Sequence, residues 1–330
     1  MSQIKKHIGL FYELAIPVVL FFLFAFLAPG FGVNSIRVLI SQSLFTFVMS
    51  LGLSFVMMTG LFDLSFGTQL LLVTIFSARL AQLAGTAGML LGALLGGILL
   101  SMCVGFLYVT LKIPSMVLSL SMVMILEYLG RVLAGTQGAI NIGADVTAWG
   151  KAPYSYLYTV VAVVIYCILV YYTKTGKHLN LVGDNELIAL QIGVNVRKTK
   201  FLAFSLCGVF CGIGAIMNLC YSGVAAASVG MASLSSVFRP MMAVMIAMAL
   251  MNLYQNIVIN LYVSVLSVII IFNGVIALGI PSSMEDVILG SFLLIIMTIT
   301  GNVSRWAELL RRRSARRALA AEKGGPAPTR

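Results

Sequence analysis

The chain has 330 residues, of which 60% are hydrophobic and only 9% are charged. Its mean hydropathy of +1.05 is far above that of a soluble domain, so the composition excludes a soluble enzyme and indicates a membrane protein. The formal net charge of +11 would suit nucleic acid, but the positions of the basic residues follow membrane topology instead, and we expect no nucleic-acid partner.

Long apolar segments follow one another along almost the whole chain. A bilayer core about 30 Å thick takes roughly 20 apolar residues per helix. Such segments lie near 12–30, 36–59, 65–84, 87–109, 114–134, 153–173, 201–221, 238–259, 261–279 and 286–302. The first lacks a cleavage site and is expected to be retained. The runs are continuously apolar rather than alternating, which excludes a β-barrel. We predict an all-α integral membrane protein with about ten transmembrane helices.

The basic residues set the expected orientation and domain limits. With ten spans and a cytoplasmic N-terminus, 16 of the 21 Lys and Arg residues fall on the cytoplasmic side, eight of them from Arg305 onward. This bias predicts that both termini are cytoplasmic. We expect a transmembrane domain over 1–304 and a basic tail over 305–330, whose arginines contact membrane lipid headgroups.

An acid interrupts the apolar sequence at the junction of the second and third expected spans. In "GLFDLSFG", Asp63 follows Gly60 and precedes an apolar run. This arrangement predicts an N-cap whose carboxylate accepts the amides near Ser65 and Phe66, rather than a proton or cation site. We expect a break between two helices here, formed by a short set of residues: Gly60, Asp63, Ser65, Gly67 and Gln69.

Few other polar residues lie within the expected spans. Glu127 and Arg131 are four residues apart, so they are expected to neutralise one another on one helix face, a reading at least as good as solute binding. The candidates for lining a solute pathway are Gln69, Ser119, Ser121, Glu127 and Asn218. Each of them has an alternative role in hydrogen bonds between helices. The segment 135–153 contains turn-forming residues and is expected to be an outer loop or a short re-entrant piece.

The longest polar segment, 174–200, is expected on the cytoplasmic side and contains a short helix. Asp184 or Asn185 can cap it, Glu186 lies in its first turn, and Gly193 ends it. A helix this short does not hold itself together in water. It therefore docks on the ends of its own transmembrane helices or in a groove of a partner, and the spacing does not separate these two readings.

Motifs of common enzyme sites are absent from the sequence. It has no phosphate-binding glycine loop, no HExxH and no nucleophile elbow, and its two histidines are His7 and His178. Its five cysteines lie in apolar segments, so we interpret them as buried thiols. We expect no catalytic residue, no metal site and no cofactor bound directly to the chain.

Three stretches resemble the membrane subunit of ribose-type ABC importers. They are "TGLFDLSFGTQLLL", "LKIPSMVLSLSMVMIL" and "GKHLNLVGDNELIALQIGVNVRKTK", and the likeness spans about residues 45–220. The third is the most specific, with Gly176, Gly183, Asn185, Ala189, Gly193, Val194, Lys200 and Gly208 at the positions that the family pattern requires.

The resemblance implies a multi-pass permease in a bacterial inner membrane, paired with a second permease subunit as a homodimer or heterodimer. It also implies a separate ATPase subunit that binds ATP and Mg, and a periplasmic or lipid-anchored solute-binding protein. The short cytoplasmic helix would be the coupling helix for that ATPase, through Asp184, Asn185, Glu186, Leu187, Leu190 and Gly193. Pentoses, hexoses, furanose-like signals and nucleosides all remain open as solutes.

The chain also departs from the family pattern in two places. Glu127 replaces a basic residue and Tyr128 a glycine, and the segment after residue 223 has Met and Asn where glycines are expected. These departures leave the solute open and suggest one half of a heteromeric pair. The alternatives to an importer subunit are an ion-coupled secondary transporter and a membrane scaffold without a solute pathway.

Overall fold

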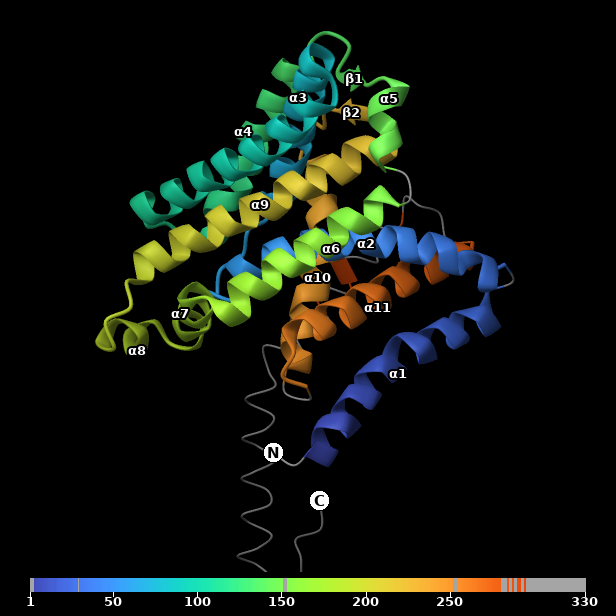
Figure 1. Ribbon diagram of the computed structural model, residues 1–330, viewed down its shortest axis with the longest axis vertical. Helices are drawn as coiled ribbons and strands as arrows, with labels where there is room; N and C mark the ends of the chain where they lie inside the picture. The colour runs from blue at the N-terminus through green and yellow to red at the C-terminus, as the bar shows by residue number, and fades with distance from the viewer. Residues whose placement is uncertain are drawn as a thin grey trace, which may run out of the picture. The chain divides into compact units, whose positions relative to one another are not determined.

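The computed structural model describes residues 3–28, 30–150, 153–251 and 254–279, and the single positions 284, 287, 290, 291 and 294. Contacts divide the chain into two units, Met1–Glu285 and Asp286–Arg330. The helices and strands shown in Figure 1 belong to the first unit: α1 (Gln3–Leu27), α2 (Val33–Met57), α3 (Phe66–Leu111), α4 (Ser115–Ala134), β1 (Ala139–Asn141), α5 (Ala144–Thr147), η1 (Ala148–Gly150), α6 (Tyr154–Cys167), η2 (Ile168–Tyr172), α7 (Lys174–Asp184), α8 (Glu186–Gln191), α9 (Val196–Ser222), β2 (Val224–Ala226), η3 (Ala232–Leu234), α10 (Ser235–Leu250) and α11 (Ile257–Ala277).

The chain is an all-α membrane protein, as its composition predicts. In the part of the chain that the structure describes, seven helices are long and apolar enough to cross a membrane: α2, α3, α4, α6 with η2, α9, α10 with η3, and α11. The apolar part of α1, Glu13–Leu27, is shorter. The expected span 286–302 lies outside the described residues except for single positions, and the tail 305–330 lies outside them altogether.

The helix α3 contains two of the expected spans, folded back on each other. Its backbone leaves helical geometry at Ala84 and at Gly85, where φ is +61°. The Ser77 hydroxyl donates to the Met89 carbonyl oxygen over 2.8 Å. Twelve residues of straight helix would separate these groups by about 18 Å. The halves before and after Gly85 therefore pack antiparallel, because only glycine adopts this φ without strain.

The second half of α3 packs directly on α9 (Figure 1). A Cβ atom on Gly208 would lie 2.5 Å from the Gly97 carbonyl oxygen, and one on Gly212 would lie 2.6 Å from the Ala93 carbonyl oxygen. The two backbones touch because neither glycine carries a side chain, the arrangement by which small residues join membrane helices.

The expected loop at 135–153 is ordered where the structure describes it. The strand β1 pairs antiparallel with β2, with Ala139 opposite Ala226, and α5 and η1 follow it. This small sheet ties the connection after α4 to the connection after α9, so the segment is neither an irregular loop nor a re-entrant helix.

Candidate functional site

Asp63 lies in the break between α2 and α3, within a network of buried polar side chains. Its Oδ1 accepts the Ser65 amide at 2.9 Å and the Ser65 hydroxyl at 2.5 Å, and its Oδ2 accepts Gln69 Nε2 at 2.9 Å. Gln69 Oε1 accepts the Ser101 hydroxyl at 2.6 Å. All four side chains are almost completely buried. The network therefore connects the helix break to the second half of α3.

The N-cap predicted at Asp63 is wrong in register. α3 begins at Phe66 with Ser65 in the N-cap position, so the carboxylate lies two residues earlier and accepts the Ser65 amide alone of the two expected. The reason is that Gln69, one turn into α3, supplies a second donor to the same carboxylate. The other glycines of the break differ in role: Gly60 has a φ of +76°, and a Cβ on Gly67 would clash with the Ser236 hydroxyl of α10.

Glu127 of α4 binds the start of α10 rather than Arg131. Its Oε2 accepts the Met231 amide at 2.8 Å, and its Oε1 accepts the amide and hydroxyl of Ser233 at 2.9 and 2.5 Å. The predicted pair with Arg131 is therefore wrong. An exposed pair at this spacing is worth only about 0.2–0.5 kcal/mol, whereas a buried amide without an acceptor costs about 1–3 kcal/mol.

The remaining predicted lining residues are scattered. The hydroxyl of Ser119 donates to the Met116 carbonyl and that of Ser121 to the Val117 carbonyl, so both bonds stay within α4. Of the five candidates, only Asn218 lines the pocket described below. The Ser233 hydroxyl also contacts the Thr68 hydroxyl at 2.6 Å, a contact that no pattern in the sequence signalled.

The predicted cytoplasmic helix is present as α8, and Asn185 is its cap. Asn185 Oδ1 accepts the amides of Leu187 and Ile188 at 2.9 and 3.1 Å. Asp184 is the last residue of α7, a helix that was not predicted. The chain turns at Gly193, where φ is +86°. The start of α8 and the start of α9 are joined by an ion pair between Glu186 and Lys200.

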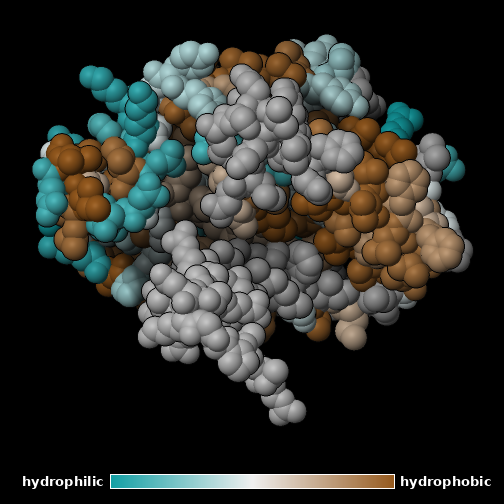
Figure 2. Space-filling view, turned by 90° about the horizontal axis from the view of Figure 1, so that it is seen from below, coloured by the Kyte–Doolittle hydropathy of each residue, from teal (hydrophilic) through white to brown (hydrophobic). Residues whose placement is uncertain are grey.

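One side of α8 packs inward and the other carries exposed apolar side chains. Ala189 is completely buried in a small cluster of the same segment, with Val182, Val194 and Val196. The outward side chains, which we call the α8 surface, are Leu187, Ile188, Leu190 and Ile192, exposed by 72, 54, 56 and 59%. Figure 2 shows hydrophobic surface bordered by hydrophilic side chains at the left, where α7 and α8 lie in Figure 1. The helix is therefore anchored on its own segment and still presents a hydrophobic face.

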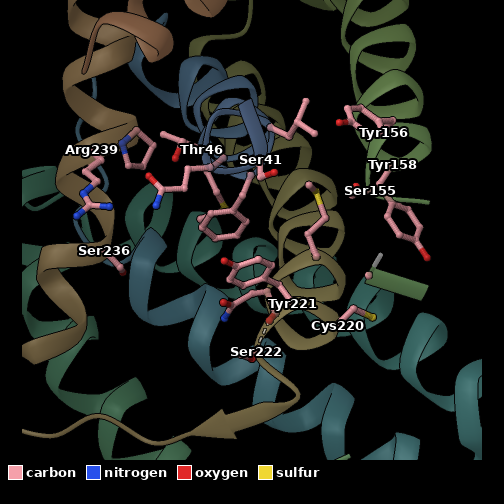
Figure 3. A pocket seen from close by; sticks show the side chains of 18 of the residues that line it. Ser41, Thr46, Ser155, Tyr156, Tyr158, Cys220, Tyr221, Ser222, Ser236 and Arg239 are labelled. Atoms are coloured by element: carbon pink, nitrogen blue, oxygen red, sulfur yellow. Dashed lines mark hydrogen bonds between the residues drawn. The ribbon is translucent and has the colours of Figure 1, made fainter. Parts of the chain in front are cut away.

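A large pocket lies between α2, α6, α9 and α10 (Figure 3). Its volume is about 940 Å³, within the range of small-molecule sites. Most of its lining is polar: Arg37, Ser41, Gln42, Thr46, Thr147, Ser155, Tyr156, Tyr158, Asn218, Tyr221, Ser222, Ser236 and Arg239. The lining includes two guanidinium groups and no carboxylate. The sequence placed both arginines toward the outer side, but no spacing signalled that they share a pocket.

The pocket and the α8 surface lie at opposite ends of α9. α8 precedes the first turn of α9, whereas the pocket is lined by Met217 and the residues that follow it at the other end. At 1.5 Å per residue, this helix of 27 residues is about 40 Å long. The two features therefore face opposite sides of the membrane that α9 crosses.

Comparison with known proteins identifies the family. Residues 35–297 match the profile of a family described as branched-chain amino acid transport system / permease component. Among curated proteins, the ribose import permease protein RbsC of Escherichia coli K12 is 25% identical over 221 residues, which cover 61% of this chain and 66% of that relative, slightly less than two thirds of its length.

Two further relatives match over a longer stretch. The autoinducer 2 import system permease protein LsrD of Yersinia enterocolitica is 25% identical over 76% of this chain and 78% of that protein. LsrD of Yersinia pseudotuberculosis is 26% identical over 83% of this chain and 86% of that protein. No solved structure gave a significant match. Because the profile covers well over half of the chain, the protein belongs to this family of transport permeases, with relatives in sugar ABC import systems.

Proposed function

We propose that the chain is a membrane permease subunit of an ATP-binding cassette importer that moves a sugar or sugar-like solute. The observation that carries this proposal is the α8 surface, in which a capped and anchored helix presents four exposed apolar side chains next to a membrane domain. Such a helix fits a hydrophobic groove of a partner. The RbsC and LsrD relatives, named as import permeases, support the same reading.

The partner at the α8 surface is a separate ATPase subunit, which binds ATP and Mg and hydrolyses the nucleotide. Leu187 and Leu190 enter its groove, while Asp184, Asn185, Glu186 and Gly193 hold the helix in place. A second permease subunit and a periplasmic or lipid-anchored binding protein complete the importer. The chain itself is a transport component and not the enzyme.

The proposed topology has ten spans with both termini in the cytoplasm of a bacterial cell, in the inner membrane. The antiparallel halves of α3, which count as two spans, support this number. The permease domain is 1–304, the coupling segment is 174–200, and the basic tail is 305–330. We assign Gly60, Asp63, Ser65, Gly67 and Gln69 to the helix break that shapes the pathway, and Asn218 to its lining.

The proposal is tested by reconstitution. The chain is purified with the ATPase and binding protein encoded beside it and placed in proteoliposomes, and uptake of labelled ribose and related sugars is measured with and without ATP. We expect uptake only with ATP and the ATPase. Uptake by the chain alone under a proton or sodium gradient would instead make it an ion-coupled secondary transporter.

A further inference from the structure

The pocket between α2, α6, α9 and α10 has the chemistry of a solute site. Polar side chains from four helices converge on it, although each helix crosses an apolar medium in which an unpaired polar group is costly (Figure 3). In that view, Arg239 and Ser236 lie on one side of the pocket and Tyr156 and Tyr158 on the other. A membrane protein keeps such a lining where it meets water or a polar ligand.

The charge of the lining selects the class of ligand. Arg37 and Arg239 both border the pocket, and none of the lining residues is acidic. No ion pair joins Arg37 to any other residue in the part of the chain that the structure describes. Arginine presents a planar fork of donors that matches carboxylates and phosphates. Hydroxyls, Asn218 and Gln42 supply further hydrogen bonds, and tyrosine rings can stack on a sugar face.

The pocket is closed on the side of the α8 surface. There α2 and α6 are joined by a hydrogen bond between the Ser54 and Tyr166 hydroxyls at 2.8 Å. The Tyr166 ring, which is completely buried, packs on Phe55 at 4.9 Å and on Phe210 at 6.0 Å. The pocket itself is lined by the opposite ends of α2 and α6. A solute released on the side away from the ATPase therefore meets this pocket first.

We propose that this pocket is the entry-side solute site of the permease, and that it takes a small hydroxylated solute bearing one negative group, a sugar carboxylate or a sugar phosphate. This inference rests on the proposed importer function, and it narrows the solute from sugars in general to anionic ones. The phosphate of an anionic lipid shares the same chemistry, so the test separates the two sources.

The test measures binding to the full chain in nanodiscs of neutral lipid, without the ATPase. The probes are D-ribose 5-phosphate, D-gluconate and uncharged D-ribose. We expect at least one anionic probe to bind about tenfold or more tightly than ribose, because a hydrogen bond to a charged group is worth about 1.5–3 kcal/mol. Arg37→Gln and Arg239→Gln should each remove most of that difference.

Two further variants make the result interpretable. Arg37→Lys keeps the positive charge and should retain part of the preference, while Arg131→Gln, an exposed arginine of α4 outside the pocket, should behave as the parent protein. Each variant is accepted only if its thermal unfolding matches that of the parent. If Arg37→Gln does not fold, Arg37→Lys and Arg239→Gln carry the test.

Three outcomes overturn the inference. In the first, neither anionic probe binds better than ribose. In the second, the glutamine variants bind the anions unchanged. In the third, native mass spectrometry finds an arginine-dependent phospholipid that neither probe displaces. If the glutamine variants still import a neutral sugar with ATP, the pocket assignment fails and the importer function stands; if no ATPase binds the chain, the importer function itself fails.

Discussion

Replacement of Leu187 and Leu190 by alanine separates folding of the chain from its association with the ATPase. The two side chains are 72 and 56% exposed, so truncating them removes little contact inside the chain. Surface changes of this kind usually alter stability by about 0.5 kcal/mol or less. The double variant should therefore insert, fold and unfold at the same temperature as the parent protein.

The expected loss of binding follows from the area that the partner would cover. Complete burial of a leucine side chain is worth about 1.5–3 kcal/mol. Scaled by the exposed fractions of Leu187 and Leu190, the pair contributes about 2–4 kcal/mol, which corresponds to a roughly 30- to 900-fold weaker complex. The affinity is measured by titrating labelled ATPase onto the chain in nanodiscs, and ATP-driven uptake should fall in parallel.

The matched control replaces two leucines of α3, Leu95 and Leu99, which are exposed by 55 and 64% but lie outside the α8 surface. This double alanine variant should bind the ATPase as the parent does. Parent-like affinity of the variant with changes at Leu187 and Leu190 would contradict the assignment of the α8 surface. Equal loss in both variants would point to a general effect of apolar truncation.

Asp63→Asn should lose transport in part, because the new amide faces the Gln69 amide, and Asp63→Leu should lose more; combining Asp63→Asn with Gln69→Glu exchanges donor and acceptor and should restore uptake, whereas failure of this rescue would show that the charge at Asp63 matters. Glu127→Ala should lower thermal stability by about 2 kcal/mol or more, since it leaves two amides at the start of α10 without an acceptor, while Arg131→Ala should have no effect; equal effects of the two would favour the ion pair. Gly208→Ala places a methyl group 2.5 Å from a carbonyl oxygen of α3 and should reduce the yield of folded protein, as measured by size exclusion; normal yield would contradict the close backbone packing.

The sequence is sufficient to predict features governed by neighbouring residues. The short helix α8, its cap at Asn185 and its stop at Gly193 depend on groups within a few positions of one another, so their pattern is visible in a single sequence. The all-helical class follows from the length and continuity of the apolar runs. Both predictions rest on local chemistry.

Features that depend on distant pairing were missed or placed wrongly. Glu127 binds residues more than a hundred positions away, and local spacing pointed to Arg131 instead. The polar face of α9 gave no indication that Asn218 would meet Arg37 in a pocket. In each case the partner is set by how the helices pack, which no periodicity within one helix reveals.

The two departures from the family pattern meet in space. Glu127 stands where a basic residue is usual, and the segment after 223 lacks the usual glycines. The structure joins them, because the Glu127 carboxylate accepts the amides of Met231 and Ser233. A substitution at either place therefore depends on the other, and we expect exchanges of one segment alone with a relative to destabilise the chain.

The helix α9 works mechanically as a lever. It carries the α8 surface at one end and the pocket at the other, and Gly208 presses on α3 near its middle, in the position of a fulcrum. A tilt of about 5° around that point moves each end of a 40 Å helix by about 1.7 Å, in opposite directions. Nucleotide-driven movement of the ATPase could thus widen or narrow the pocket without any relay of side chains between them.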